Sequence, residues 1–161
     1  MVQSGSDAIE ANASVSWTGW SGKVTGGSGA LNSDTATQVQ LGGPGGGTNP
    51  EELLAAALAN CYTSTLTSLA RAKNIDLVTI ETKARTRLAW DADTPHHIAG
   101  GDLTVRIVAD APEHRVRTLA GEARDHCPVC NVLKATTNVT LAVSVVRSSA
   151  VGLEGGQESS S

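Results

Sequence analysis

The sequence predicts an α+β fold built around two main helices. Two segments, 50–73 and 111–125, have helical periodicity and begin with helix-start signals. Segments in which apolar and polar residues alternate precede, separate and follow these helices, as expected of half-buried strands. The strands are grouped and do not alternate one by one with helices, which favours α+β over a wound α/β sheet.

The N-terminal part predicts a meander of two or three strands. Residues 13–17 alternate between apolar and polar types, and residues 35–41 do so again. In the second strand we expect every second residue from Thr35 to Leu41 to share one face. The glycine- and serine-rich stretch between the two segments supplies the turns.

The first main helix has the clearest start in the chain. A glycine-rich loop leads to Asn49, a favourable N-cap, which Pro50 follows at the first helical position. Glu52 stands where a capping box places an acidic residue. The periodicity predicts that this helix runs to about Lys73 and stops at Asn74.

The remaining elements follow from local periodicity and turn residues. In order, we expect a strand over 78–90, a turn region over 91–101, a strand over 103–109, a helix over 111–125, a short helix over 127–135 and a strand over 139–145. The first two strands of this series predict a hairpin.

Length and composition predict one domain over residues 13–147. With 161 residues, the chain can bury a core of its own without a disulfide or metal staple. Residues 1–12 are expected to be a flexible N-terminus. Residues 148–161 have the serine- and glycine-rich composition of a disordered tail.

Charge and cysteine content limit the partners and the compartment. A net charge of −4 and a pI near 5.5 argue against nucleic acid as a partner. No apolar run is expected to reach the length of a membrane span, and the N-terminus has no signal-peptide pattern. Three cysteines, an odd number, favour a cytoplasmic protein that keeps its thiols reduced for chemistry.

Cys61 lies on a helix whose apolar stripe is expected to be buried. Counting about 100° per residue, one stripe of this helix contains Leu54, Leu58, Cys61, Thr65 and Leu69. An apolar setting disfavours the thiolate, so the pKa of Cys61 is expected at or above the free value of about 8.5. On its own, this pattern is that of a structural cysteine.

Cys127 and Cys130 form a C-x-x-C pair at a predicted helix start, where unsatisfied N–H groups favour an acidic thiol. Three interpretations compete at this point. The pair is a thioredoxin-like redox site, half of a metal site with His126 and either Cys61 or His114, or a source of resolving thiols for Cys61. The thioredoxin-like motif normally follows a strand, whereas this pair follows a helix.

Two motifs at this separation resemble a known family. GTNPEELLAAALANCY (47–62) followed by CPVCNVLKA (127–135) is similar to the OsmC/Ohr family of osmotically inducible and organic hydroperoxide resistance proteins. The resemblance covers about residues 14–147. The segments GTNPEEL and VLKA place the chain nearer to the OsmC branch than to Ohr.

The resemblance implies a fold, an assembly and an activity. The fold is OsmC-like, with antiparallel sheets packed around two main helices in an intertwined homodimer. The activity is a thiol-dependent peroxidase that reduces organic hydroperoxides, and also hydrogen peroxide, in the response to oxidative and osmotic stress. It works in the cytoplasm with a dithiol reductant of lipoyl or another type, and needs no cofactor, metal, membrane or nucleic acid.

The resemblance also implies roles for individual residues. Cys61 falls on the peroxidatic cysteine and Cys127 on the resolving cysteine. Glu51 falls on the glutamate that holds an arginine against the reactive sulfur. Leu54 and Leu58 are then expected to line an apolar pocket for the alkyl hydroperoxide.

The sequence departs from the family in two places. The activating arginine of the N-terminal strands is absent, and its position corresponds to Gln40 or Gln38; Lys23 is the only basic residue before Cys61. A neutral amide does not replace the roughly 3–4 kcal/mol needed to lower a buried thiol pKa by two to three units. An alternative function is therefore an OsmC-like dimer that binds a small apolar ligand without efficient turnover.

Cys130 stands where relatives commonly have serine, and is either an auxiliary thiol or a packed side chain.

Overall fold

The structure is a computed structural model that describes residues 9–90, 92–93 and 95–151. Its contacts divide the chain into two compact units, Met1–Pro50 and Glu51–Ser161, each with its own three-stranded sheet. Residues 1–8 and 152–161 of the predicted flexible ends lie outside the described residues. Where the sequence predicts the start of the tail, the chain forms the one-turn helix α4 (Ser148–Val151). The domain boundaries at 13 and 147 stay predictions.

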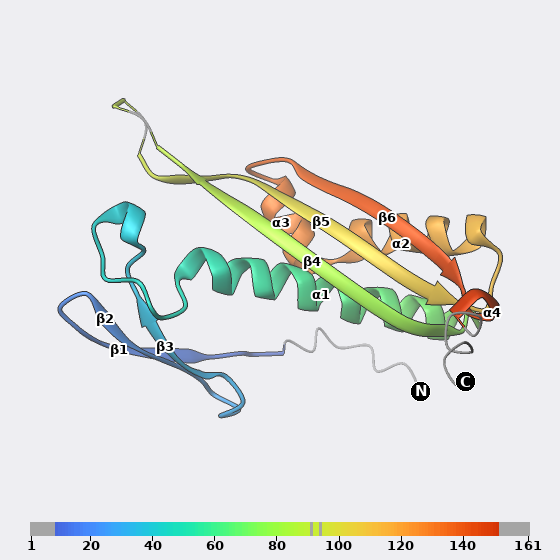
Figure 1. Cartoon of the computed structure of the whole chain (residues 1–161), viewed down its shortest axis with the longest axis horizontal. Coiled ribbons are helices and arrows are strands. Elements are labelled where there is room, and N and C mark those ends of the chain that lie inside the picture. The colour runs from blue at the N-terminus through green and yellow to red at the C-terminus, as the bar shows by residue number, and fades with distance from the viewer. Residues whose placement is uncertain (1–8, 91, 94, 152–161) are drawn as a thin grey trace, which may run out of the picture. The chain divides into compact units, whose positions relative to one another are not determined.

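The first unit contains an antiparallel meander (Figure 1). Its strands are β1 (Ala13–Thr18), β2 (Ser21–Gly26) and β3 (Asn32–Ala36), in the order β1-β2-β3. The predicted meander is therefore confirmed, with three strands. The turn between β1 and β2 contains Gly19 at φ +62°, a conformation that glycine adopts without steric cost.

The prediction of one strand over residues 35–41 is wrong in its second half. Strand β3 ends at Ala36, and a short 3₁₀ helix, η1 (Val39–Leu41), follows. The glycine-rich loop causes this change because its backbone folds back: the Gly45 N–H donates to the Thr37 carbonyl at 3.1 Å. Gly43 also approaches Thr37 so closely that a Cβ atom would lie 2.2 Å from the Thr37 oxygen.

The second unit is a mixed sheet with helices (Figure 1). In chain order its elements are α1 (Pro50–Ala72), β4 (Leu77–Ala89), β5 (His97–Ala109), α2 (Glu113–His126), α3 (Pro128–Lys134), β6 (Val139–Arg147) and α4. The sheet order is β4-β5-β6, and the predicted hairpin of β4 and β5 is confirmed. Strand β6 pairs with β5 in parallel, not antiparallel as the resemblance implies, because α2 and α3 form a crossover between them. The α+β class is confirmed.

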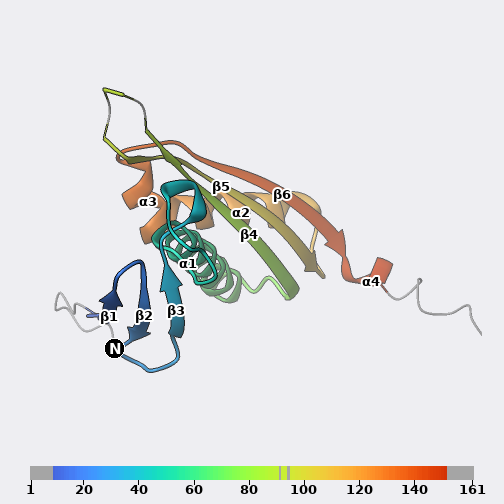
Figure 2. The same ribbon diagram turned by 60° about the vertical axis from the view of Figure 1, so that its left-hand side comes forward.

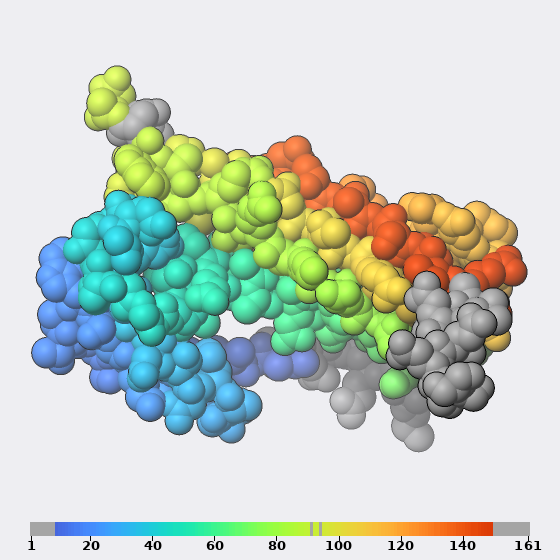
Figure 3. Space-filling model, in the orientation of Figure 1, coloured from blue at the N-terminus to red at the C-terminus, as the bar shows by residue number. Residues whose placement is uncertain are grey.

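Helices α1, α2 and α3 pack against one face of this sheet, and the core lies between them (Figure 2). The most buried apolar side chains come from all these elements: Leu58, Tyr62 and Leu66 of α1; Leu103, Val105 and Ile107 of β5; Val116 and Leu119 of α2; and Cys130 and Leu133 of α3. On the side of the sheet seen in Figure 3, the three strands form one continuous surface. Every expected apolar residue of β5 from Leu103 to Ala109 is buried.

Helix α1 buries a different stripe from the one that periodicity predicts. Its buried residues are Leu58, Tyr62, Leu66 and Ala70, which recur every fourth position. Of the predicted stripe only Leu58 is fully buried, and Cys61 lies half-buried on the flank. The predicted end is confirmed, because Asn74 follows the helix at φ +52°.

One residue of β4 departs from the alternation of its strand, and one further expectation needs correction. Val78 is 52% exposed, because a β-bulge between Leu77 and Thr79 turns it out of the apolar face.

Helix α1 also has the length and apolar composition of a membrane span, contrary to the sequence-based expectation. One such helix is weak support for a membrane protein, since the core helix of a soluble protein has the same properties.

Candidate active site

Cys61 lies near the middle of α1 and is half-buried. One turn further on, the Thr65 hydroxyl donates to the Cys61 carbonyl at 2.9 Å. Leu54 and Leu58 occupy the preceding turns; Leu54 is half-buried, and Leu58 is fully buried in the core. Leu58 packs toward Gly101, where a Cβ atom would lie 3.3 Å from its Cδ2. Of the two predicted pocket residues, Leu54 is thus the one with an accessible surface in this unit.

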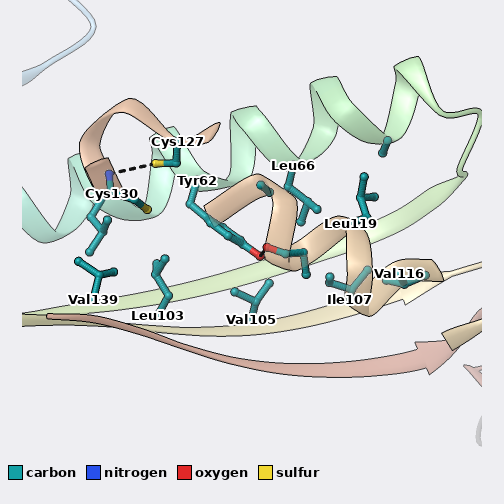
Figure 4. Close-up of a cluster of buried hydrophobic side chains, with 14 of the residues drawn as sticks. Tyr62, Leu66, Leu103, Val105, Ile107, Val116, Leu119, Cys127, Cys130 and Val139 are labelled. Carbon is teal, nitrogen blue, oxygen red and sulfur yellow. Dashed lines mark hydrogen bonds between the residues drawn. The ribbon is translucent and has the colours of Figure 1, made fainter. Parts of the chain in front are cut away.

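Cys127 occupies the break between α2 and α3. Its backbone is extended, at φ −71° and ψ 115°, and it serves as the N-cap of α3, with Pro128 in the first turn. An extended N-cap followed by proline is a favourable helix start. Its sulfur is fully buried and accepts a hydrogen bond from the Cys130 N–H at 3.3 Å (Figure 4).

The fold brings the thiols of Cys61 and Cys127 together. The two side chains act on each other's pKa, and the Val129 backbone also acts on the pKa of Cys61. The first turn of α3 therefore acts on both sulfurs, through the Val129 backbone on Cys61 and through the Cys130 N–H that donates to Cys127. The two thiols that the family resemblance pairs are thus neighbours, and their roles stay predictions.

Burial opposes ionisation of both thiols. It is the largest cause that raises the pKa of Cys61, and the neighbouring Cys127 raises this pKa further. The Val129 backbone and the Thr65 hydroxyl act in the opposite direction and lower it. Burial also raises the pKa of Cys127, so the expectation of an acidic thiol at this helix start is wrong. Desolvation of a fully buried sulfur outweighs one backbone hydrogen bond.

Cys130 is the third thiol of the cluster. It is fully buried in α3 and interacts with the Cys127 side chain. Burial raises its pKa, whereas the positive charges of Lys134 and Arg124 lower it. Both cations also contact Asp125, at 3.0 Å from Lys134 and 3.2 Å from Arg124. Of the three thiols, Cys130 is the one whose pKa is lowered by both Lys134 and Arg124 among the main causes of its shift.

Glu51 lies in the first turn of α1, and its side chain is half-buried. Its backbone carbonyl accepts a hydrogen bond from the Thr86 hydroxyl at 2.8 Å, which ties the start of α1 to β4. Thr86 thus fixes the backbone from which the Glu51 carboxylate projects. The family role of Glu51, holding a cation at the sulfur, stays a prediction.

The groups with the largest effects on Cys61 do not include a cation that would replace the missing arginine. These groups, among the described residues, are the surrounding burial, Val129, Cys127 and Thr65. Arg71 is ten residues further along α1, about 15 Å at 1.5 Å per residue. Arg124 acts on Tyr62 and Cys130 instead. Lys23 and Gln40 are exposed residues of β2 and η1 in the first unit, and their auxiliary roles stay predictions.

Tyr62 is a member of this cluster that the sequence analysis missed. Its side chain is fully buried beside the thiols, and its hydroxyl donates to the Ala120 carbonyl of α2 at 3.1 Å (Figure 4). Burial raises the pKa of this phenol well above its ordinary value, so it stays neutral. The four-residue spacing of Leu58, Tyr62, Leu66 and Ala70 is the signal that could have found it.

The metal interpretation has no support in the arrangement of the side chains. Over the described ranges, no three His, Cys, Asp or Glu side chains are grouped in a way that could hold a metal ion. His126 is exposed, and its Nδ1 interacts with the Glu122 carbonyl at 2.8 Å. The thioredoxin-like interpretation is weakened by the order of elements, since Cys127 follows α2 and not a strand.

Comparison with known proteins identifies the family. A family model described as OsmC-like protein matches residues 43–142, which include all three cysteines. The chain belongs to this family. The resemblance inferred from the two motifs is therefore confirmed.

The relatives of this OsmC-like chain carry a common name. An organic hydroperoxide resistance protein of Xanthomonas axonopodis pv. citri is 29% identical over 123 residues, covering 71% of this chain and 80% of the relative. An organic hydroperoxide resistance protein-like 2 of Staphylococcus saprophyticus is 25% identical over 128 residues, with coverages of 79% and 89%. Placement nearer to the OsmC branch stays a prediction.

Solved structures agree with the fold. The organic hydroperoxide resistance protein OsmC of Legionella pneumophila has a TM-score of 0.76 at 29% identity, covering 86% of this OsmC-like chain and 99% of that protein. The organic hydroperoxide resistance protein OhrB of Bacillus subtilis has a TM-score of 0.65 at 25% identity, with coverages of 84% and 98%. The OsmC-like fold is thus confirmed.

Proposed function

We propose that this protein is a thiol-dependent peroxidase that reduces organic hydroperoxides, with Cys61 as the peroxidatic and Cys127 as the resolving cysteine. The observation that carries the proposal is the direct interaction of the Cys61 and Cys127 thiols, which come from different elements. The names of the relatives support a peroxide-related role. Hydrogen peroxide is a second possible substrate of the same chemistry.

The first step forms a sulfenic acid. The Cys61 thiolate attacks the outer oxygen of the hydroperoxide, an S–O bond forms and the O–O bond breaks. The alkoxide takes up a proton and leaves as an alcohol. Sulfur is oxidised by two electrons and the peroxide is reduced by two. The half-exposed position of Cys61 suits this step, because the attacking sulfur must meet a substrate from outside.

The second step forms a disulfide. The Cys127 sulfur attacks the Cys61 sulfenic sulfur, an S–S bond forms and hydroxide leaves as water after taking up the Cys127 proton. Full burial keeps Cys127 from reacting with peroxide itself while leaving it beside Cys61. An external dithiol, of lipoyl or another type, then reduces the disulfide by two electrons and restores both thiols.

The location and assembly belong to the same proposal. Three cysteines that are all free fit a reducing, cytoplasmic compartment. Partners of this protein are then a second copy in a homodimer, the hydroperoxide and the dithiol. The apolar Leu54 side chain lies about two helical turns before Cys61, where it would contact the alkyl group of the substrate.

Stoichiometric oxidation tests the proposal. Reduced protein is treated with one equivalent of an alkyl hydroperoxide, and the products are mapped by mass spectrometry after trypsin digestion. We expect a disulfide that requires Cys61, and peroxide turnover with excess dithiol that is abolished in Cys61→Ser. Full turnover by that variant would refute the proposal.

A second function is favoured by the raised pKa of Cys61. With its pKa raised, Cys61 has little thiolate at neutral pH, and the protein would bind a small apolar ligand as an OsmC-like dimer without efficient turnover. Wild-type protein that forms no disulfide with hydroperoxide, at neutral or alkaline pH, would support this function over the first.

A further inference from the structure

Cys130 is a buried nucleophile that the two-cysteine mechanism does not use. It lies one turn after Cys127, and its own N–H donates to the Cys127 sulfur at 3.3 Å. Both side chains are fully buried at the start of α3, next to Tyr62 (Figure 4). A side chain required only for packing at this position could equally be a small apolar residue.

Cys127 is shared by the other two thiols. Its side chain interacts with Cys61 of α1 and with Cys130 of α3. The Cys61 thiol interacts with Cys127 through its side chain, whereas its interaction with Cys130 is one of charge alone. A disulfide between Cys61 and Cys127 would therefore have a further thiol in contact with its Cys127 sulfur.

We propose that Cys130 is a third thiol of the reaction cycle, which takes over the disulfide and leaves it between Cys127 and Cys130. This inference rests on the proposed peroxidase function. The Cys130 thiolate attacks the Cys127 sulfur, a Cys127–Cys130 bond forms and the Cys61–Cys127 bond breaks. Cys61 leaves as a thiolate and takes up the proton that Cys130 released. No electrons enter or leave, so the exchange needs no reagent from outside.

Two local features favour this exchange. Lys134 and Arg124 place positive charge near Cys130, which stabilises the attacking thiolate against its burial. Cys127 and Cys130 are three positions apart at a helix start, a spacing that keeps their side chains within about 5–6 Å. A disulfide spans about 3.5–4.5 Å between Cβ atoms, so a small local movement at the helix start allows the bond to form.

The exchange changes how much peroxide one chain consumes. After the transfer Cys61 is a free thiol again, and it reacts with a second hydroperoxide before any external reductant acts. Its sulfenic acid then has no thiol to condense with, because both other sulfurs are in the disulfide. Wild-type protein should thus consume two equivalents of hydroperoxide per chain, whereas a chain without Cys130 should consume one.

Trypsin separates the two disulfides. Cleavage after Lys23 and Arg71 releases Cys61 within residues 24–71, and cleavage after Arg124 and Lys134 releases the other two thiols within residues 125–134. A Cys61–Cys127 disulfide links the two peptides. A Cys127–Cys130 disulfide leaves them separate and makes the 125–134 peptide lighter by two hydrogens.

The test uses reduced full-length protein and two equivalents of cumene hydroperoxide, without reductant. For the wild type we expect linked peptides at early times, then the lighter 125–134 peptide and a Cys61 sulfenic acid that dimedone traps. Peroxide consumption should approach two equivalents. A wild type that stops at one equivalent with permanently linked peptides overturns the inference, and this result does not depend on the folding of any variant.

Variants separate this inference from the proposed function. Cys130→Ser should consume one equivalent and keep the peptides linked, and Cys130→Ala should behave in the same way. If these variants also consumed two equivalents, the third-thiol role would be refuted while the peroxidase stood. If Cys61→Ser still formed the Cys127–Cys130 disulfide with hydroperoxide, transfer from Cys61 would be refuted in favour of a thioredoxin-like pair.

Discussion

Cys61 and Cys127 sit in opposite kinds of backbone. Cys61 lies within an unbroken helix, where backbone N–H groups bond to carbonyls of the same helix, whereas Cys127 lies at a break between two helices. The backbone groups that act on both sulfurs come from the first turn of α3. Helix α1 therefore holds Cys61 in a half-buried position, and helix α3 supplies the polar contacts to both Cys61 and Cys127.

In the proposed function, the difference in exposure would give the two thiols different roles. Cys61 is half-buried, so a substrate can reach it, but its environment raises its pKa. Cys127 is fully buried, so under the proposed function the Cys61 sulfenic acid, and not the peroxide, would oxidise it. If these roles are correct, replacing Cys61 and replacing Cys127 should block the reaction at different steps.

The largest expected effect comes from Cys127→Ser. This variant should still reduce one equivalent of hydroperoxide at Cys61 but then stop, because the sulfenic acid has no resolving thiol in contact. Mass spectrometry should show one added oxygen on the 24–71 peptide and no link to 125–134. Cys130→Ser is the matched control and should keep multiple turnover with excess dithiol. A Cys61–Cys130 disulfide in the first variant would contradict the assigned order.

The next effect is the dependence of the peroxide reaction on pH. The thiolate is the reactive form, and a raised pKa leaves a small thiolate fraction at neutral pH. The rate should therefore increase about tenfold per pH unit up to the Cys61 pKa and level off above the ordinary thiol value of about 8.5. Stopped-flow measurement of sulfenic acid formation between pH 6 and 10 checks this. A plateau already at pH 6 would show that a cation activates Cys61 after all.

A smaller effect is expected from Thr65→Val. The Thr65 hydroxyl lowers the pKa of Cys61, so its loss should raise that pKa and slow the reaction at pH 7. A hydrogen bond worth about 0.5–1.5 kcal/mol limits the decrease to about tenfold. Thr67→Val is a matched control, because Thr67 makes the same bond to a carbonyl four residues earlier, at 2.9 Å, but is exposed. Equal decreases in both variants would point to a general effect on the helix.

The smallest effect is expected from Tyr62→Phe, which tests the packing beneath both thiols. This change removes the hydrogen bond to the Ala120 carbonyl but keeps the buried ring. The free energy of unfolding should fall by about 1 kcal/mol, while the disulfide map stays the same. Denaturant unfolding measures the first quantity and peptide mapping the second. A changed map would mean that the hydroxyl positions the thiols.

Residues next to the ends of helices and strands were sufficient to predict most of these elements from the sequence. The Asn49-Pro50 start and the Asn74 end of α1 depend on residues next to the helix ends, and the structure has them within about two positions. The same holds for α2 and for the Cys127-Pro128 start of α3. The family resemblance of the two motifs, and not a local signal, predicted the pairing of two thiols whose elements the fold brings together.

The features that were missed depend on distant contacts. Alanine-rich α1 is apolar on several sides, so periodicity could not tell the Tyr62 stripe from the neighbouring Cys61 stripe before the sheet was known. The parallel pairing of β6 with β5 depends on the crossover. The raised pKa of Cys127 follows from burial among other elements, which a helix-start signal does not contain.

Cys127 and Cys130 both lie in the crossover between β5 and β6, far along the chain from Cys61. The choice of disulfide therefore decides how many residues the bond encloses in the unfolded chain. A disulfide from Cys61 to Cys127 closes a loop of about 67 residues and would restrict the unfolded ensemble by about 4 kcal/mol, whereas one from Cys127 to Cys130 closes about four residues, for about 2 kcal/mol. The two oxidised forms should therefore melt at different temperatures. Thermal unfolding can then follow the position of the disulfide along the chain without any chemical label.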